Sequence, residues 1–257
     1  MIDVTTWTAH ASREPSEQFL AAMDRRWRDG LECPATRCEW SVGRLHSLAL
    51  LHLDRAAHKR RLRAIYVTAG MCDEGDHGFT PMSDLVPGDM YGPEAVRVVH
   101  TGDASPLAAA IAAAKDDPYT VAATVITEAQ FVSVDTYDDH SASLLNPATH
   151  GAVIPFIYAP ADESADDAYD REDLLRANGF STYTIDVSAL GDDPIDAHRH
   201  LAGLLEDVFD EIAHLKADSA GRVMSVSPLW PMVVVRAPAE WEPCVDGRVD
   251  VREHTQS

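Results

Sequence analysis

The fold is decided by residues 144–157, which read Leu-Leu-Asn-Pro-Ala-Thr-His-Gly-Ala-Val-Ile-Pro-Phe-Ile. A turn at His150 and Gly151 precedes an apolar run over residues 152–158, which we predict to be a strand. Similar runs at residues 64–68, 121–127, 182–187 and 232–236 are also predicted strands. Segments with helical periodicity alternate with most of these runs, which is the pattern of βαβ units around a parallel sheet. The sequence therefore predicts a layered α/β fold, with an open, mostly parallel sheet and helices on both faces.

Three segments have the apolar spacing of amphipathic helices: residues 16–27, residues 44–61, and a segment that starts at Asp193 with a proline in its first turn. This third segment carries His198, His200 and His214, which we expect to be solvent-exposed rather than metal ligands. Residues two apart face different directions on a helix, so His198 and His200 are unsuited to sharing a metal. Residues 72–106 are rich in Gly, Pro and Asp and show little periodicity, which predicts a long functional or disordered loop.

The composition indicates one acidic globular domain. The chain has 257 residues, of which 46% are apolar and 25% charged, so it can bury one large core. We expect a single domain over residues 1–243 and a loose tail over residues 244–257. The formal net charge of −21 disfavours binding to nucleic acid or to an anionic membrane, because like charges repel. The first residues lack the features of a signal peptide and no apolar run could span a bilayer, so we expect a cytoplasmic location.

The four cysteines do not indicate a disulfide framework. They are too few and too scattered for one in a chain of this length. Cys33 and Cys38 would suit half of a zinc site, but no second pair of Cys or His follows at ligand spacing. We therefore expect reduced thiols and no bound metal.

Several segments follow one another in the order known from one enzyme family. They are Ile65-Tyr66-Val67-Thr68-Ala69-Gly70, Leu145-Asn146-Pro147-Ala148, Gly151-Ala152-Val153-Ile154-Pro155, Arg176-Ala177-Asn178-Gly179-Phe180 and Trp230-Pro231-Met232-Val233-Val234-Val235-Arg236. Together they resemble the N-terminal, diphosphate-binding (PP) domain of phosphoketolases and other transketolase-like thiamine-diphosphate enzymes. The resemblance runs through most of the chain but through this one domain only, without the family's pyrimidine-binding and C-terminal domains. It implies the thiamine-diphosphate-binding fold.

The resemblance also implies where a cofactor would lie. The family holds a divalent cation, and through it the cofactor's diphosphate, with Gly-Asp-Gly after one strand and Asn-Gly-Tyr after a later one. This chain has Thr127-Glu128-Ala129 and Pro160-Ala161-Asp162 at these two places. Side chains replace bare backbone at the first place, and an amide oxygen is lost at the second. We therefore expect a degenerate site that binds neither magnesium nor thiamine diphosphate.

Candidate catalytic residues lie in the loops after the predicted strands, because ligands of open parallel sheets bind beyond the carboxyl ends of strands. The loop after the second predicted strand contains Glu128, Asp135, Tyr137 and His140, whose carboxylates, phenol and imidazole suit proton transfer near neutral pH. A solvated acidic loop is the alternative for the carboxylates. His140 falls on the position of the family's active-site loop histidine. His77 is a candidate for the histidine of the glycine-rich stretch after the first predicted strand.

Two other groups of polar residues have a structural interpretation. The carboxylates of Asp162, Glu163, Asp166, Asp167 and Asp170 are interpreted as a solvent-facing helix start rather than a metal site. His150, in the turn before the strand at residues 152–158, either reaches the pocket or lies on the surface, and the sequence leaves both open.

Three functions from different classes remain. The first is a subunit of a repurposed, cofactor-independent enzyme of specialised-metabolite biosynthesis, a lyase acting on a small polar metabolite by acid/base elimination or ring closure, for example aziridine formation with loss of sulfate. The second is a split subunit of a thiamine-diphosphate-dependent phosphoketolase or transketolase. The third is a non-catalytic partner that stabilises or regulates a related subunit. All three predict a heterodimer with a pyrimidine-domain-like chain, because a lone diphosphate-binding domain exposes an apolar face that its relatives bury.

Overall fold

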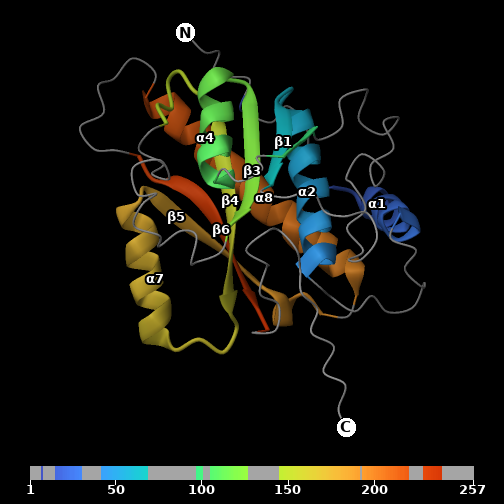
Figure 1. Cartoon of the computed structure of the whole chain (residues 1–257). Helices are drawn as coiled ribbons and strands as arrows, with labels where there is room; N and C mark the ends of the chain where they lie inside the picture. The colour runs from blue at the N-terminus through green and yellow to red at the C-terminus, as the bar shows by residue number, and fades with distance from the viewer. Residues whose placement is uncertain are drawn as a thin grey trace.

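Strand β4 (Ala152–Pro160) contains the apolar second half of residues 144–157 and lies inside a sheet of parallel strands. The computed structural model describes residues 7, 15–30, 42–68, 97–100, 105–126, 145–191, 193–219 and 228–238. Within these residues the sheet has six strands, in the order β2-β1-β3-β4-β6-β5 (Figure 1). The other strands are β1 (Arg63–Thr68), β2 (Arg97–His100), β3 (Thr120–Ile126), β5 (Phe180–Asp186) and β6 (Trp230–Ala237). The predicted α/β fold with a parallel sheet is confirmed.

Helices cover both faces of this sheet. Helix α4 (Pro106–Asp116) packs against β1, β3 and β4 and lies in front of the sheet in Figure 1, whereas α8 (Pro194–Ser219) runs behind it. Helix α2 (Val42–Lys59) packs beside α8 and against β1, and α1 (Glu17–Gly30) also contacts α8. Helix α7 (Ala165–Ala177) packs against the edge strand β5. The result is the layered arrangement that the alternating pattern of the sequence predicts.

Short polar residues explain where two of these helices begin. The hydroxyl of Ser105 accepts the N–H of Ala108 at the start of α4, and that of Ser164 accepts the N–H of Asp167 at the start of α7. Each bond satisfies a backbone donor that has no partner within the helix. Pro106 occupies the first helical position, where its missing N–H costs nothing.

Gly151 is required at the point where β4 begins. A Cβ added there would lie 2.3 Å from the carbonyl oxygen of Thr120 and 2.7 Å from that of Asp117. The N–H of Gly151 donates to the carbonyl of Ala114, at an N–O distance of 2.6 Å. The turn is thus packed tightly between the end of α4 and the start of β3, and this contact places β4 in register with β3.

The hydrophobic core lies between the sheet and its helices. Every residue of β4 is buried except Pro160 at its carboxyl end, and β3 is buried almost as completely. Burial of this extent on both faces is typical of parallel strands covered by helices. Among the described helices, none is both long and apolar enough to cross a bilayer.

The structure differs from the sequence-based prediction in one strand. The prediction of a loop over residues 72–106 is wrong near its end, where β2 forms the edge of the sheet. A four-residue strand is too short to show a periodic pattern, so the sequence carried no signal for it. The four cysteines and the predicted tail over residues 244–257 lie outside the described residues.

Candidate functional site

The carboxyl ends of the parallel strands share one edge of the sheet, here called the carboxyl edge, and this edge is the candidate site. Strand β1 pairs with β2 on one side and with β3 on the other, so the order of strands reverses between β1 and β3. Ligands of open parallel sheets bind in the crevice at such a reversal. Strands β1, β3 and β4 reach this edge at Thr68, Ile126 and Pro160, close to the predicted positions.

The residues that the sequence singles out for catalysis are not among those described. Glu128, Asp135, Tyr137, His140 and His77 all lie outside the described ranges. The structure does describe the strands that lead toward them, since β3 ends at Ile126 and β1 at Thr68, and both strands run to the carboxyl edge. Their catalytic roles therefore stay predictions.

The structure describes Pro160-Ala161-Asp162, the residues that the resemblance assigns to the family's second cation position. Pro160, the last residue of β4, has no side-chain oxygen and is exposed. The N–H of Ala161 donates to the carbonyl of Ala237 at the end of β6, at 2.8 Å. Asp162 is exposed. The loop thus lacks the family's amide but carries a carboxylate, an oxygen donor of the kind that magnesium prefers, two residues further on.

Arg236 is a charged residue of this edge that the sequence analysis gave no role. It lies near the end of β6, and its Nη2 donates to the carbonyl oxygen of Ala161 at 2.9 Å. Asp186, its register partner at the end of β5, accepts the N–H and hydroxyl of Ser188 at 2.9 and 2.6 Å. The Ser188 hydroxyl bond is the main reason that the pKa of Asp186 is lowered, and the positive charge of Arg236 contributes less. The sequence indicated this role only through the presence of Arg236 in the segment from Trp230 to Arg236, which carries the family resemblance.

Taken together, the described groups at the carboxyl edge fit a diphosphate and a hard cation in part. A guanidinium suits an anionic oxygen, and an exposed carboxylate suits a divalent cation. Within the described ranges, no group of three or more His, Cys, Asp or Glu residues is arranged to hold a metal. Any complete cation site at this edge therefore needs ligands from residues beyond the described ranges.

The acidic segment before and inside α7 is a helix start, as predicted. Asp162, Asp166, Asp167 and Asp170 are exposed, and α7 begins directly after its N-cap, Ser164. Glu163 is the exception, because its side chain is buried in an ion pair with Arg171. Among the described residues these five carboxylates do not gather into a metal site with one another.

A buried imidazole pair connects α2 and α8, and here the prediction of a solvated His198 is wrong. His198 and His52 are both fully buried, and His52 Nε2 lies 2.9 Å from His198 Nδ1. The Asp24 carboxylate of α1 lies 3.7 Å from His198 Nε2. Burial, followed by the nearby charges of His198 and Arg55, lowers the pKa of His52. His200 and His214 are exposed, as predicted.

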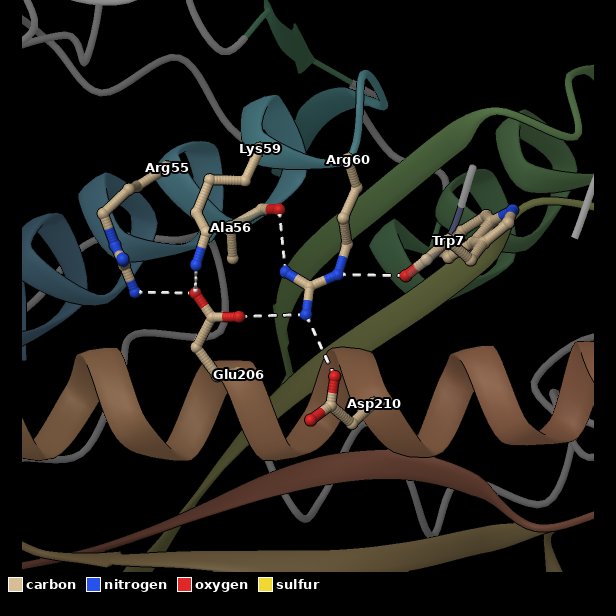
Figure 2. A network of polar contacts seen from close by, with 7 residues as sticks. All are labelled: Trp7, Arg55, Ala56, Lys59, Arg60, Glu206 and Asp210. Carbon is tan, nitrogen blue, oxygen red and sulfur yellow. Dashed lines mark hydrogen bonds and ion pairs between the residues drawn. The ribbon is translucent and has the colours of Figure 1, made fainter. Parts of the chain in front are cut away.

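A second polar cluster, shown in Figure 2, lies further along the same two helices. The buried Glu206 carboxylate of α8 accepts Arg55 Nη2 at 3.0 Å and Lys59 Nζ at 2.7 Å, and Arg60 Nη2 lies 2.9 Å from its other oxygen. Arg60 also pairs with Asp210 at 3.1 Å. Every cation in this cluster has a partner, so its role is to join α2 to α8 rather than to bind a ligand.

His150 lies away from the candidate site. It precedes the first residue of β4 and therefore belongs to the opposite, amino edge of the sheet. Its Nδ1 accepts the N–H of Asn146 at 2.9 Å, which closes the turn before β4. Burial, then the charges of Lys115 and Lys216, lowers the pKa of His150. The sequence left open whether His150 reaches the pocket or lies on the surface. The structure places it in the turn before β4, away from the carboxyl edge.

Comparison with known proteins gives a consistent result. The sequence model of the family described as "XFP N-terminal domain" matches residues 90–255, which is more than half of the chain. A "Probable phosphoketolase" of Mycobacterium avium (strain 104) is 36% identical over 149 residues, covering 54% of this chain and 18% of that protein. One of Rhodopseudomonas palustris (strain TIE-1) is 32% identical over 160 residues, covering 58% and 20%. One of Chlorobaculum tepidum is 30% identical over 152 residues, covering 55% and 19%. The chain thus matches about a fifth of the length of these relatives.

These matches contradict the expectation that the chain uses no cofactor. Phosphoketolases, as the resemblance implies, depend on thiamine diphosphate, and the family match includes most of the carboxyl edge of the sheet. That expectation rested on the two positions at which this chain lacks the family's cation ligands, and it considered each position separately. The exposed carboxylate of Asp162 and the guanidinium of Arg236 show that polar groups suited to a cation and an anion remain beside the second of them.

Proposed function

Because the chain belongs to the XFP N-terminal domain family, we propose that it supplies the diphosphate-binding half of a phosphoketolase-like active site that uses thiamine diphosphate. The observation that carries this proposal is the extent of the family match. Residues 90–255 include strands β2 to β6, and with them most of the carboxyl edge. This is the edge at which an open parallel sheet binds its ligand.

In this proposal, Glu128 and Asp162 hold the divalent cation. Glu128 lies two residues beyond the end of β3 and Asp162 two residues beyond the end of β4. The two strands are neighbours that run to the same edge. Carboxylate oxygens are suitable ligands for magnesium, and the guanidinium of Arg236 offers a donor to a diphosphate oxygen. Thiamine diphosphate held there would supply the nucleophile for chemistry at a substrate carbonyl.

Proton transfer in this site falls to His140, with Asp135 as the carboxylate that orients the imidazole. An imidazole beside a carboxylate is a competent acid or base near neutral pH. Tyr137 and His77 are further hydrogen-bonding candidates. All four residues follow β1 or β3 in the sequence, and both of these strands end at the carboxyl edge.

The proposal includes a partner, a chain with a pyrimidine-binding domain, with which this chain forms a heterodimer in the cytoplasm. Sites of this family form between a diphosphate-binding domain and a pyrimidine-binding domain, so one half alone does not enclose the cofactor. The net charge of −21 favours a partner over nucleic acid or an anionic membrane as the binding surface.

The test is a calorimetric titration of magnesium thiamine diphosphate into the chain alone and into the chain co-purified with its partner. Arg236→Met and Asp162→Asn should each weaken binding. Loss of a charge-assisted hydrogen bond worth about 1.5–3 kcal/mol corresponds to a roughly 10- to 100-fold higher Kd for Arg236→Met. Asp166→Asn, an exposed carboxylate on α7, is the matched control and should leave Kd unchanged.

Two results would count against the proposal in different ways. Absence of binding to either form would remove the cofactor from the assignment. Binding to the co-purified form with no effect of Arg236→Met or Asp162→Asn would mean that the partner holds the cofactor, and that this chain stabilises or regulates it.

A further inference from the structure

Lys216 is a fully buried lysine near the end of α8, at the amino edge of the sheet. Its Nζ lies 3.4 Å from the carbonyl oxygen of Pro147, 2.5 Å from that of His150 and 3.3 Å from that of Gly151. These three carbonyl groups belong to the turn that leads into β4. The ammonium therefore contacts residues 144–157, the segment with which the sequence analysis begins.

Two indole rings complete the surroundings of this ammonium. Nζ lies 4.2 Å from the ring centroid of Trp7 and 5.7 Å from that of Trp230, the first residue of β6. Indole faces attract cations through their quadrupole. Trp7 is fully buried, and its carbonyl accepts Arg60 Nε at 3.0 Å. The three carbonyl groups and the two indole rings are here called the ammonium site.

The ammonium site differs from an ordinary buried ion pair. Within the described part of the chain, no carboxylate pairs with Lys216, and burial lowers its pKa to about 7. The carbonyl dipoles and indole faces act in the opposite direction, because both favour the charged form. The surroundings are thus neutral groups that converge on one cationic position, which is the construction of a receptor for a primary ammonium group.

We propose that the ammonium site is a binding site for a small primary alkylammonium ion, which the intact chain fills with its own Lys216. The tethered ammonium joins four separate segments: the N-terminal region at Trp7, the turn before β4, the end of α8 and the start of β6. It thereby holds the amino end of β4, the strand whose other end reaches the candidate cofactor site. This assignment is independent of the cofactor.

The experiment is a chemical rescue of Lys216→Ala. The substitution removes three methylene groups and the ammonium, which together have the size of n-propylammonium. Thermal unfolding is followed at pH 6, where both the probe and Lys216 are protonated. Lys216→Ala should lower Tm by roughly 5–10 °C. Propylammonium should then raise the Tm of Lys216→Ala with the logarithm of its concentration, as expected for a ligand of the folded state.

The controls separate a site from a general solvent effect. 1-Propanol, the neutral molecule of similar shape, should not rescue the variant. Wild type and Lys115→Ala, which alters an exposed lysine of α4, should not respond to propylammonium. Lys216→Met fills the space without a charge or donor and should have a lower Tm than wild type, because the three carbonyl groups lose the ammonium that contacts them.

Either of two outcomes would overturn the proposal: equal rescue by propanol and propylammonium, or a Lys216→Met protein at least as stable as wild type. If Lys216→Ala does not fold alone, refolding is carried out with each probe. Recovery with propylammonium only supports the site, whereas recovery with both or with neither contradicts it.

Discussion

Replacement of Glu206 by glutamine would test whether the polar cluster of Figure 2 determines how α2 packs on α8. The side chain of Glu206 is 1% exposed and contacts three cations. Arg55 is 4% exposed and Arg60 is 0% exposed, so neither can turn to water when the carboxylate is lost. Lys59, at 13%, is only slightly more accessible.

The expected loss follows from what remains after the substitution. Burial by itself raises the pKa of Glu206, but the hydrogen bond from Lys59 and the charges of Arg60, Lys59 and Arg55 reverse this, so the net shift is downward and the carboxylate is charged in the folded protein. Removing one partner of a buried ion pair typically costs about 3–5 kcal/mol, and Glu206 is the carboxylate that Arg55, Lys59 and Arg60 share. Glutamine keeps an acceptor oxygen but places an NH2 group beside the cations. We therefore expect Glu206→Gln to lower the free energy of unfolding by about 3–5 kcal/mol.

The assay is urea denaturation at pH 7, with Glu172→Gln as the matched control. Glu172 pairs with Arg176 on α7, and both side chains are about half exposed, at 51% and 56%. Surface pairs of this kind contribute about 0–1 kcal/mol. If Glu206→Gln cost no more than Glu172→Gln, with an unchanged m-value, the buried cluster would not contribute to stability and the argument would be refuted.

Two further predictions concern the turn before β4 and the imidazole pair. Gly151→Ala should lower the free energy of unfolding by more than about 2 kcal/mol in thermal or urea unfolding, because the added Cβ would lie 2.3 Å from the carbonyl of Thr120. Gly203→Ala, on α8 with open space around it, should instead be neutral or stabilising by up to about 1 kcal/mol, and a similar loss in both variants would contradict the steric argument. Because the folded-state pKa of His52 is lowered, the unfolded chain binds its proton first, so wild type should lose stability relative to His52→Gln as pH falls below about 6.5. Asp54, whose pKa burial raises to about 6, is present in both proteins and cancels in this comparison; parallel pH profiles would refute the assignment to His52.

The fold was predictable from the sequence because its signals are local. Runs of apolar residues that alternate with helical periodicity predict parallel strands with crossover helices, and the strands at β1, β3, β4, β5 and β6 were located within a few residues. The N-cap serines also act through neighbouring backbone groups, whereas Gly151 contacts carbonyl groups of Ala114, Asp117 and Thr120 that lie far from it in the sequence. Strand β2 was missed because its four residues gain their partner only from β1.

For the candidate site, the sequence predicts a position but not the contacts within it. Parallel strands end at one edge, so the sequence predicts that Glu128, Asp135, Tyr137, His140 and His77 lie near that edge, and because these residues are outside the described ranges this stays a prediction. The bond from Arg236 to Ala161 could not, because β6 and the loop after β4 are far apart in the sequence. The prediction that the chain uses no cofactor was wrong for a related reason. It considered each substituted ligand position separately, and the sequence does not show which groups nearby in the fold could take over the lost contacts.

By itself, the sequence determined the α/β class, the order of most elements, the family resemblance and the acidic character of this protein. These properties follow from local pattern, composition and the order of segments. The tertiary structure alone decided which polar residues are buried and with what partners. His198, Glu206 and Lys216 all lie on one helix with an ordinary amphipathic pattern. Each is buried because a different segment, α2 or the turn before β4, supplies its partner. A contact across such a distance in sequence is created by packing, and no local pattern encodes it.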